Sequence, residues 1–326
     1  MKNIVYINID FYTYNKQIID ELSKHDYHVY FYNYKPCRTS WQKFRFKKSA
    51  SFRRKMIARL VDKIVKETKD LVIDQYLVIN PTTFEESQFD TIFKGHENAK
   101  KILYLWDAIE TYPITKTYLK HFDKVYSFDP KDCDENNLGY RPTFVSDEIL
   151  EKSESCEPVV YDIFYVASYS KERYQTMMAV QKYCDENGLK FKHHLFVKNK
   201  LAYLYFKLHD RSLKKKNVAF SLLNNTEKTA LLRQSRAVLD TPLPTQKGLT
   251  MRVLEGMECH KKIITTNDYI SHYDFYNTED FFCLDPKAIH LDKARIQSPT
   301  TYTFDESSFT VASFVRGLVL SQEVNA

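Results

Sequence analysis

The stretch TQKGLTMRVLEGMECHKKIITT, residues 245–266, places a glycine, a helix-like run and an apolar strand directly after one another. Four apolar residues recur in it at helical spacing: Leu249, Val253, Leu254 and Met257. Their spacing predicts a helix over 249–260, and the preceding segment AVLD (237–240) predicts a strand. A loop that runs from the end of a strand into a helix is where parallel sheets bind their ligands.

The residues at this helix start suit an anionic ligand. Free backbone N–H groups and the helix dipole favour a phosphate there, and Gly248 lets the backbone come close to it. Lys247 and Arg252 can add charge-assisted contacts to a diphosphate, and Glu255, one turn further on, can accept hydrogen bonds from sugar hydroxyls. The alternative is an ordinary amphipathic helix in which Arg252 and Glu255 form a surface pair.

The same alternation of short apolar strands and helices runs through the whole chain. Strands are predicted at 3–9, 28–34, 75–80, 100–106, 124–128, 161–168, 192–197, 237–240, 262–266 and 280–284. Helices are predicted at 15–26, in a long basic segment ending near Thr68, and at 82–95, 117–122, 172–188, 226–235, 249–260 and 309–320. This order predicts an α/β protein with doubly wound parallel sheets.

The polar stretch 150–159 interrupts the pattern and is interpreted as a linker. It divides the chain into two domains, 1–152 and 153–326, each of ordinary size, and the last helix is expected to cross back to the first domain.

The composition points to a globular protein without a metal centre. Of 326 residues, 43% are hydrophobic and 28% charged, and the six cysteines are scattered without the spacing of a zinc site. Reduced cysteines predict a cytoplasmic location. No apolar run approaches the length of a membrane span, so we expect a soluble protein that is at most peripheral to the inner face of the cytoplasmic membrane.

Positive charge is concentrated in one segment. The net charge is +6, yet residues 35–66 contain twelve lysines and arginines and one acid. The residues expected to form a patch there are Trp41, Arg45, Lys47, Lys48, Arg53 and Arg54. Cations interleaved with aromatic side chains suit an anionic lipid interface or an acceptor site. A solvated basic face and a nucleic-acid-binding surface are the alternatives.

Residues 248–266 resemble the donor-site signature of group 1 glycosyltransferases of the GT-B fold, with Gly248, Arg252, Glu255, Ile264 and Thr265 on the signature positions. The stretches VYSFDPKD (125–132) and YDIFYVASYSKERY (161–174) are similar to parts of bacterial glycosyltransferases that build capsular polysaccharide or lipopolysaccharide.

The resemblance implies two Rossmann-like domains facing a cleft and a metal-independent transfer without a cofactor. The donor would be a nucleotide-diphosphate sugar. The acceptor would be an oligosaccharide, which in this family is often attached to a lipid diphosphate. Nucleic acid is not an expected partner. Donor-binding residues would be Ser168, Tyr169, Lys198, Lys247, Gly248, Thr250, Met251, Arg252 and Glu255, and Glu255 is also a catalytic candidate.

Two positions depart from the family pattern. His260 stands where the signature has a second glycine, and Lys247 stands where many retaining members have a glutamate. A lysine cannot accept hydrogen bonds from sugar hydroxyls as a carboxylate does, so retention or inversion at the anomeric carbon stays open.

An inverting enzyme needs a base near the acceptor hydroxyl. Asp107 follows the predicted strand 100–106 and is the catalytic candidate, with Asp10 after the first strand as a weaker one. The sequence DCD contains Asp132 and Asp134, the pattern that holds a metal ion in GT-A glycosyltransferases. A metal-dependent GT-A enzyme is therefore a further alternative.

Overall fold

The computed structural model describes residues 1–9, 13–35, 37, 39–150 and 157–320, which form two compact α/β units. Unit 1 comprises Met1–Ser146 and the segment from Ser308 on, and unit 2 comprises Asp147–Ser307. The structure thus divides the chain after Ser146, whereas the sequence placed the boundary after residue 152. Most of the predicted linker, 151–156, lies outside the described residues.

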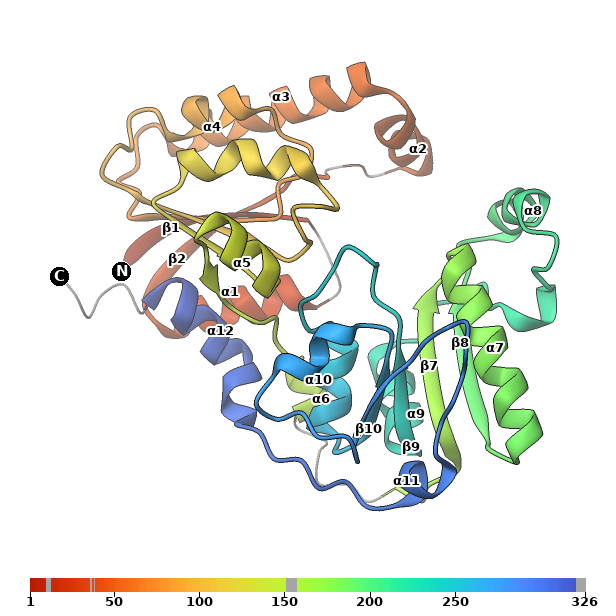
Figure 1. Cartoon of the computed structure of the whole chain (residues 1–326). Helices are drawn as coiled ribbons and strands as arrows, with labels where there is room; N and C mark the ends of the chain where they lie inside the picture. The colour runs from red at the N-terminus through yellow and green to blue at the C-terminus, as the bar shows by residue number, and fades with distance from the viewer. Residues whose placement is uncertain (10–12, 36, 38, 151–156, 321–326) are drawn as a thin grey trace. The chain divides into compact units, whose positions relative to one another are not determined.

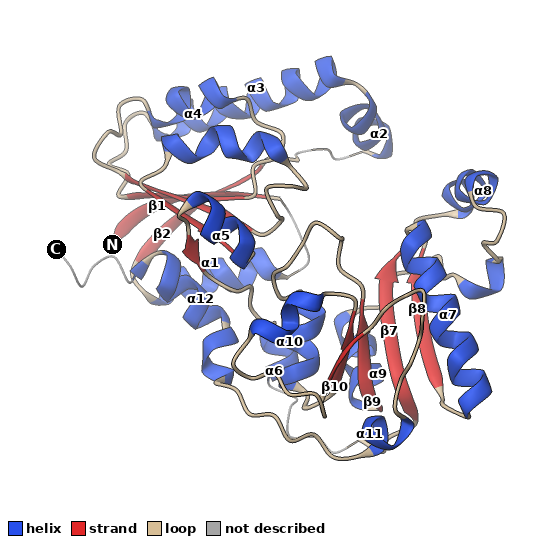
Figure 2. Cartoon of the chain, viewed as in Figure 1, coloured by secondary structure: helices blue, strands red, loops and turns tan. Residues whose placement is uncertain are grey.

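The sheet of unit 1 is parallel, with the strand order β2-β1-β3-β4-β5-β6. Figure 2 shows strands in red and helices in blue. Its strands are β1 (Lys2–Asn8), β2 (Tyr27–Asn33), β3 (Gln75–Ile79), β4 (Lys100–Leu105), β5 (Lys124–Ser127) and β6 (Gly139–Tyr140). The strand order reverses between β1 and β3, and such reversals open a crevice at the carboxyl ends of the strands.

Helices cover both faces of this sheet (Figure 1). One face carries α1 (Tyr14–Lys24) and α12 (Val311–Leu318), and the other carries α3 (Ala50–Thr68), α4 (Glu86–Phe93) and the 3-10 helix η1 (Pro113–His121). The C-terminal helix α12 packs on unit 1 through Phe314, whose ring centroid lies 4.9 Å from that of Tyr104 in β4. Remaining helices of the unit are α2 (Ser40–Lys48) and α5 (Pro130–Asn136).

The prediction of one long basic helix up to Thr68 is wrong in one respect, because the segment forms two helices separated at Ser49. This residue is extended, with φ −114° and ψ 109°, and its hydroxyl accepts a hydrogen bond from the Phe52 amide at 3.2 Å. Ser49 thereby caps α3 and separates it from α2. One side of α3 belongs to the core: Ile57, Leu60, Val61 and Ile64 are buried.

Unit 2 repeats the design with the parallel order β11-β10-β9-β7-β8. Its strands are β7 (Tyr161–Ser168), β8 (Phe191–Phe196), β9 (Ser235–Asp240), β10 (Lys262–Thr265) and β11 (Phe281–Cys283). Its helices are α6 (Asp147–Leu150), α7 (Lys171–Asn187), α8 (Lys200–His209), α9 (Asn225–Arg233), α10 (Met251–Glu258) and α11 (Lys293–Gln297), with short 3-10 turns η2 (Lys215–Asn217) and η3 (Asp268–His272). A further 3-10 turn, η4 (Glu306–Phe309), spans the point where the chain returns to unit 1. The order reverses between β7 and β9. The predicted class of two doubly wound parallel-sheet domains is confirmed.

Helix α10 lies close against its sheet because Gly256 has no side chain. A Cβ atom there would come within 2.6 Å of a methyl of Val238 in β9 and 2.8 Å of one of Ile263 in β10. The four apolar residues that predicted this helix are buried, as expected. The helix begins at Met251 rather than Leu249, because Thr250 is extended and its hydroxyl accepts a hydrogen bond from the Val253 amide.

A buried ion pair fixes the start of β10, where Lys262 is the first residue. Lys262 Nζ lies 2.7 Å from Asp280 Oδ1, and both side chains are almost fully buried. Burial acts to raise the pKa of Asp280, but hydrogen bonds from Lys262 and Thr301 outweigh it and lower that pKa to about 2. The pair joins β10 to the segment that leads into Thr301.

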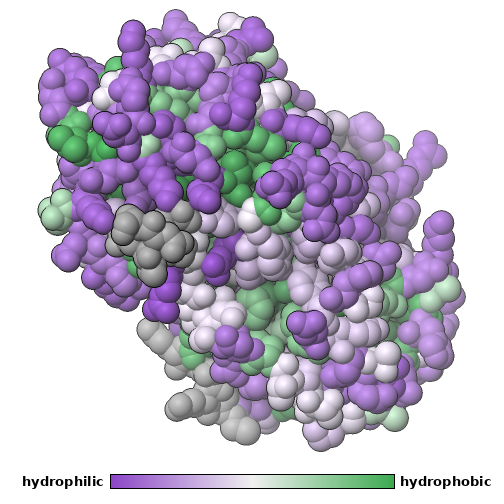
Figure 3. All heavy atoms as spheres, turned by 60° about the vertical axis from the view of Figure 1, so that its left-hand side comes forward, coloured by the Kyte–Doolittle hydropathy of each residue, from purple (hydrophilic) through white to green (hydrophobic). Residues whose placement is uncertain are grey.

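On the face seen in Figure 3, hydrophilic side chains predominate and hydrophobic atoms show in smaller areas among them. This is the ordinary surface of a chain in which 28% of the residues are charged.

His260 ends α10 in a backbone conformation that favours glycine. Its φ is +49°, in the left-handed region, and the Lys261 amide closes the helix end on the Gly256 carbonyl at 2.9 Å. A left-handed residue after a helix is most often glycine, which explains the glycine of the family signature at this position.

Replacing His260 with glycine is expected to raise the free energy of unfolding by about 0.5–1 kcal/mol, because glycine adopts this φ without strain. Urea denaturation of His260→Gly against the parent measures the change. The control is His290→Gly, at an exposed position whose φ is not positive; it is expected to lower stability. A His260→Gly variant no more stable than the parent would show that the left-handed backbone costs nothing here.

Candidate active site

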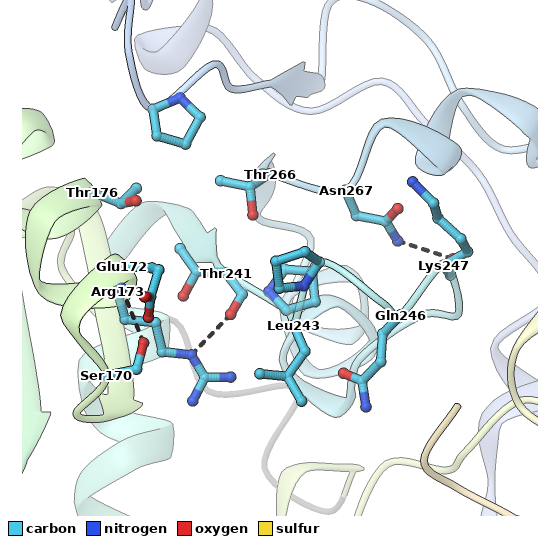
Figure 4. A pocket seen from close by; sticks show the side chains of 13 residues that line it. Ser170, Glu172, Arg173, Thr176, Thr241, Leu243, Gln246, Lys247, Thr266 and Asn267 are labelled. Atoms are coloured by element: carbon cyan, nitrogen blue, oxygen red, sulfur yellow. Dashed lines mark hydrogen bonds between the residues drawn. The ribbon is translucent and has the colours of Figure 1, made fainter. Parts of the chain in front are cut away.

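Unit 2 contains a cavity of about 510 Å³ at the carboxyl ends of its strands (Figure 4). Its lining comes from the start of α7 after β7, the loop after β9, the turn after β10 and the loop after β11. The lining includes Ser170, Glu172, Arg173, Thr241, Gln246, Lys247, Thr266 and Asn267. The cavity therefore lies at the reversal of strand order between β7 and β9. It borders the loop between the predicted strand 237–240 and helix 249–260, where ligand binding stays a prediction.

Asp240, the last residue of β9, organises the base of this site. Its buried carboxylate accepts hydrogen bonds from the Thr250 hydroxyl at 2.9 Å, from Arg252 Nη1 at 2.9 Å and from the Thr265 hydroxyl at 3.1 Å. One carboxylate thus joins the end of β9, the start of α10 and the end of β10.

Two arginines approach this carboxylate from different helices. Arg252 comes from α10, and Arg173 comes from the first turn of α7 and donates from Nε to the Thr241 carbonyl at 3.0 Å. Burial lowers the pKa of Arg173, and the positive charge of Arg252 acts in the same direction while Asp240 opposes it. Arg252 pairs with the Asp240 carboxylate, while Arg173 lies close enough for the charges of Asp240 and Arg252 to affect its pKa. An anionic ligand could accept charge-assisted hydrogen bonds from guanidinium groups in this position.

Arg252 has donor capacity left over. Its Nε is buried and has no hydrogen-bond acceptor among the described residues. In this structure its guanidinium pairs with Asp240, and diphosphate binding by Arg252 stays a prediction. A buried donor without an acceptor is rare in a folded protein and is consistent with a ligand that supplies one.

The predicted residues before α10 lie beside the cavity. Lys247 lines it and pairs with Asp268 at 2.8 Å, while Asn267 donates to the Lys247 carbonyl at 2.9 Å (Figure 4). Gly248 is buried, and Met251 is the first residue of the helix.

The Glu255 side chain, which the sequence predicted to contact a sugar, contacts Lys228 in this structure. Its carboxylate is buried and lies 2.6 Å from Nζ of Lys228 in α9. A ribose or sugar hydroxyl would have to share this carboxylate with Lys228. Both its sugar-binding and its catalytic role remain predictions.

The other donor-site candidates of unit 2 diverge. The Ser168 carbonyl accepts a hydrogen bond from Arg173 at 3.4 Å, which places it next to the site. Tyr169 turns toward α8, with its hydroxyl 3.1 Å from Asp210 and its ring 4.6 Å from that of Phe206. Lys198 is exposed after β8 and is not part of the cavity lining.

In unit 1 the candidate base Asp107 follows β4. Its carboxylate accepts a 2.6 Å hydrogen bond from Asn80, a left-handed residue that follows β3. Asp10, the weaker candidate, lies outside the described residues. Burial raises the pKa of Tyr112 and the Asp107 carboxylate adds to this rise, so the charge of Asp107 acts on a residue that lines the cavity of unit 1.

That second cavity measures about 680 Å³ and is lined by cations. They are Lys35, Lys43, Lys47 and Arg53. Among the described residues, no acidic side chain lines the cavity and none of the four cations forms a salt bridge. Positive charge that no salt bridge compensates suits an anionic group of a ligand.

The rest of the predicted patch is a mixed aromatic and basic surface on α2 and the start of α3. Trp41 and Phe44 are 62% and 63% exposed, and the Arg45 guanidinium lies 4.7 Å from the Trp41 ring. Lys48 is also exposed, and Arg54 pairs with Glu85 at 2.9 Å. Among the helices of the described residues, none is long and apolar enough to cross a membrane.

The DCD motif does not form a metal site in the described structure. Asp132 is buried and accepts a hydrogen bond from the Ile109 amide, whereas Asp134 is exposed on the same short helix, α5. Burial raises the pKa of Asp132 to about 6, which disfavours the ionised form that a cation requires. The described residues contain no group of three or more His, Cys, Asp or Glu side chains that could hold a metal ion.

The site also contains residues that the sequence interpretation missed, chiefly Asp240, Arg173 and Asn267. Asp240 ends the predicted strand 237–240, and Arg173 lies just after the predicted strand 161–168. A search for charged residues at every strand end and in the first turn of each following helix would have found both.

Known structures share this architecture, although no protein-family model and no curated protein sequence matches the chain. The UDP-GlcNAc 2-epimerase of Methanocaldococcus jannaschii matches with a TM-score of 0.54 at 10% identity over 100% of both chains. The epimerase of Neisseria meningitidis bound to UDP-GlcNAc matches with 0.53 at 9% identity, again over 100% of both chains. An α-glucosyltransferase in complex with UDP and a 13-mer DNA matches with 0.53 at 13% identity, over 81% of this chain and 78% of that one. Likeness at such low identity shows the fold, and the expected GT-B type is confirmed.

Replacing Asp240 with asparagine is expected to lower the free energy of unfolding by about 2–4 kcal/mol, because Arg252 loses the charge that compensates it. Urea denaturation at neutral pH measures the loss. Asp268→Asn is the matched control: its carboxylate also pairs with a cation of this site but is 82% exposed, so its removal should change stability by less than about 0.5 kcal/mol. Equal effects of the two substitutions would contradict the organising role of Asp240.

Proposed function

We propose that the chain is a glycosyltransferase that moves a sugar from a nucleotide-diphosphate sugar to an oligosaccharide acceptor during synthesis of a bacterial surface polysaccharide, a capsule or lipopolysaccharide. The observation that carries the proposal is the cavity of unit 2, with Arg173 and Lys247 in its lining at the reversal of strand order. Fold neighbours bind UDP or UDP-GlcNAc, which supports a nucleotide sugar as the ligand.

The donor diphosphate would lie between the starts of α7 and α10. Both helices present N-terminal amides near the cavity, capped by Ser170 and Thr250. Arg173, Arg252 and Lys247 would supply charge-assisted hydrogen bonds to the phosphate oxygens, and Glu255 would accept from ribose or sugar hydroxyls.

In the transfer step, an acceptor hydroxyl oxygen forms a bond to the anomeric carbon of the sugar. The bond from that carbon to the diphosphate oxygen breaks, and the nucleoside diphosphate leaves with the electron pair. In the inverting form, the hydroxyl proton passes to Asp107. The cations around Asp240 would stabilise the charge that develops on the leaving group.

The acceptor would bind in unit 1. The cation-lined cavity at the carboxyl ends of its strands suits a phosphate-bearing acceptor such as a lipid-diphosphate-linked oligosaccharide. The exposed Trp41 and Phe44 with their neighbouring cations would then hold the enzyme at the inner face of the cytoplasmic membrane.

A UDP-sugar epimerase is the second candidate, because two fold neighbours that span the full chain are UDP-GlcNAc 2-epimerases. An epimerase converts its nucleotide sugar without an acceptor. Incubation with UDP-sugars alone, followed by chromatography, separates the two: an epimer formed without acceptor establishes the epimerase, whereas the transferase leaves the sugar configuration unchanged.

Donor binding depends on Arg173 in this proposal. A thermal-shift screen of nucleoside diphosphates first identifies the one that stabilises the parent protein most. Isothermal titration with this nucleotide should show an affinity at least about tenfold weaker for Arg173→Ala than for the parent, with partial recovery in Arg173→Lys. Lys182→Ala, which removes an exposed cation of the same helix, is the matched control and should bind like the parent. The same titration of Arg252→Ala and Lys198→Ala tests the roles predicted from the sequence. Unchanged affinity in Arg173→Ala would exclude this residue from the donor site.

Acceptor activation depends on Asp107. Asp107→Asn should lower the rate of sugar transfer about 100-fold or more while nucleotide affinity stays the same, because a general base contributes roughly that factor. Asp134→Asn, which removes an exposed carboxylate of the same unit, is the control. If Asp134→Asn or a chelator abolished transfer instead, the metal-dependent alternative would replace this mechanism.

Lipid-linked oligosaccharide and duplex DNA are compared as acceptors, since one fold neighbour was solved with DNA.

A further inference from the structure

Helix α8 of unit 2 presents a stripe of apolar side chains to solvent. Leu201, Leu204, Tyr205 and Leu208 recur at helical spacing and are 77%, 56%, 59% and 79% exposed. We call these four residues the α8 stripe. No residue of α8 is buried, although the helix follows the edge strand β8 in a well-packed unit. Such an exposed row of large apolar groups on a soluble protein marks an interaction site.

The opposite side of α8 holds the helix in place. Tyr203 and Phe206 pack against the core of unit 2, and the Asn199 side chain caps the helix by accepting a hydrogen bond from the Ala202 amide at 2.8 Å. Lys207 Nζ donates to the Leu213 carbonyl at 2.7 Å and ties α8 to the segment that follows. The α8 stripe is thus presented by an anchored helix.

Positive charge flanks α8 on both sides in the sequence. Residues 198–216 contain seven lysines and arginines and a single acid, Asp210. Asp210 is buried and accepts hydrogen bonds from Tyr169 and Ser212, so its charge is directed inward. The exposed cations are Lys198, Lys200, Arg211, Lys214, Lys215 and Lys216.

We propose that the α8 stripe and the cations that flank α8 bind the surface of an anionic lipid bilayer. An interfacial helix needs an apolar face to enter the acyl boundary and cations to meet the lipid phosphates, and α8 with its flanks provides both. Charge favours an anionic bilayer over a second copy of this chain as the partner. A second copy would bring seven more cations to the contact, and like charges would oppose that pairing.

This surface is distinct from the aromatic and basic patch of unit 1 and does not depend on the transfer reaction. Trp41 and Phe44 belong to α2, whereas the α8 stripe belongs to the other unit. Vesicle binding is measured without donor or acceptor, so failure of the proposed enzyme activity and failure of this inference give separate results.

The test is co-sedimentation of the full chain with vesicles of phosphatidylcholine alone and of phosphatidylcholine with phosphatidylglycerol. Leu201→Ser with Leu208→Ser should weaken binding to the anionic vesicles about tenfold or more. Val72→Ser with Ile114→Ser, which also removes two exposed apolar residues, is the matched control and should bind like the parent. Exchanging Lys214, Lys215 and Lys216 for glutamine should remove most of the preference for anionic vesicles, about fivefold per cation.

Hydrogen exchange of the parent protein gives a readout that needs no variant: amides of 200–216 should become protected when anionic vesicles are added. Trp41→Ser with Phe44→Ser separates the two surfaces, and it should leave this protection in place. The inference is overturned if the parent ignores anionic vesicles, if the double serine variant of α8 binds as well as the parent, or if sedimentation velocity shows that those leucines mediate self-association instead.

Discussion

The geometry of the unit 2 site depends on one buried carboxylate, that of Asp240, which requires hydrogen-bond donors around it. Asp240 ends β9 inside the protein, where an ionised group without hydrogen bonds would be strongly destabilising. Thr250, Arg252 and Thr265 meet that need, and in doing so they fix the start of α10 and the end of β10 relative to β9. The loop between β9 and α10, which supplies much of the cavity lining, is therefore held at both ends.

The sheets were predictable from the sequence because fully buried parallel strands read as short apolar runs, and these recur between helices along the whole chain. The position of the site followed from the same pattern. Contacts between distant segments could not be read in this way: that Arg252 meets Asp240, or that Glu255 meets Lys228, follows from packing rather than from spacing. The break at Ser49 was missed because a serine capping bond competes with helix continuation through a single side chain. Helix α8 was missed because KLAYLYFKLH is apolar on most sides and shows no polar face.

The two units share a strand order but differ in the chemistry at the carboxyl ends of their strands. Unit 2 places arginines around a buried carboxylate, which compensates part of their charge. Unit 1 lines its larger cavity with four cations, and the described part of that lining contains no acidic side chain. The first arrangement favours a ligand held by directed hydrogen bonds, and the second favours a ligand selected by net charge.

The packing of α12 on unit 1 has a consequence for biosynthesis. Its partners Tyr104 and Phe144 precede unit 2 in the chain, whereas Phe314 of α12 follows it. During synthesis, one flank of the first sheet therefore lacks its cover until all of unit 2 has been translated. Unit 2 can reach its final form first, and the nascent first unit has to keep an apolar flank from aggregating until α12 has been made.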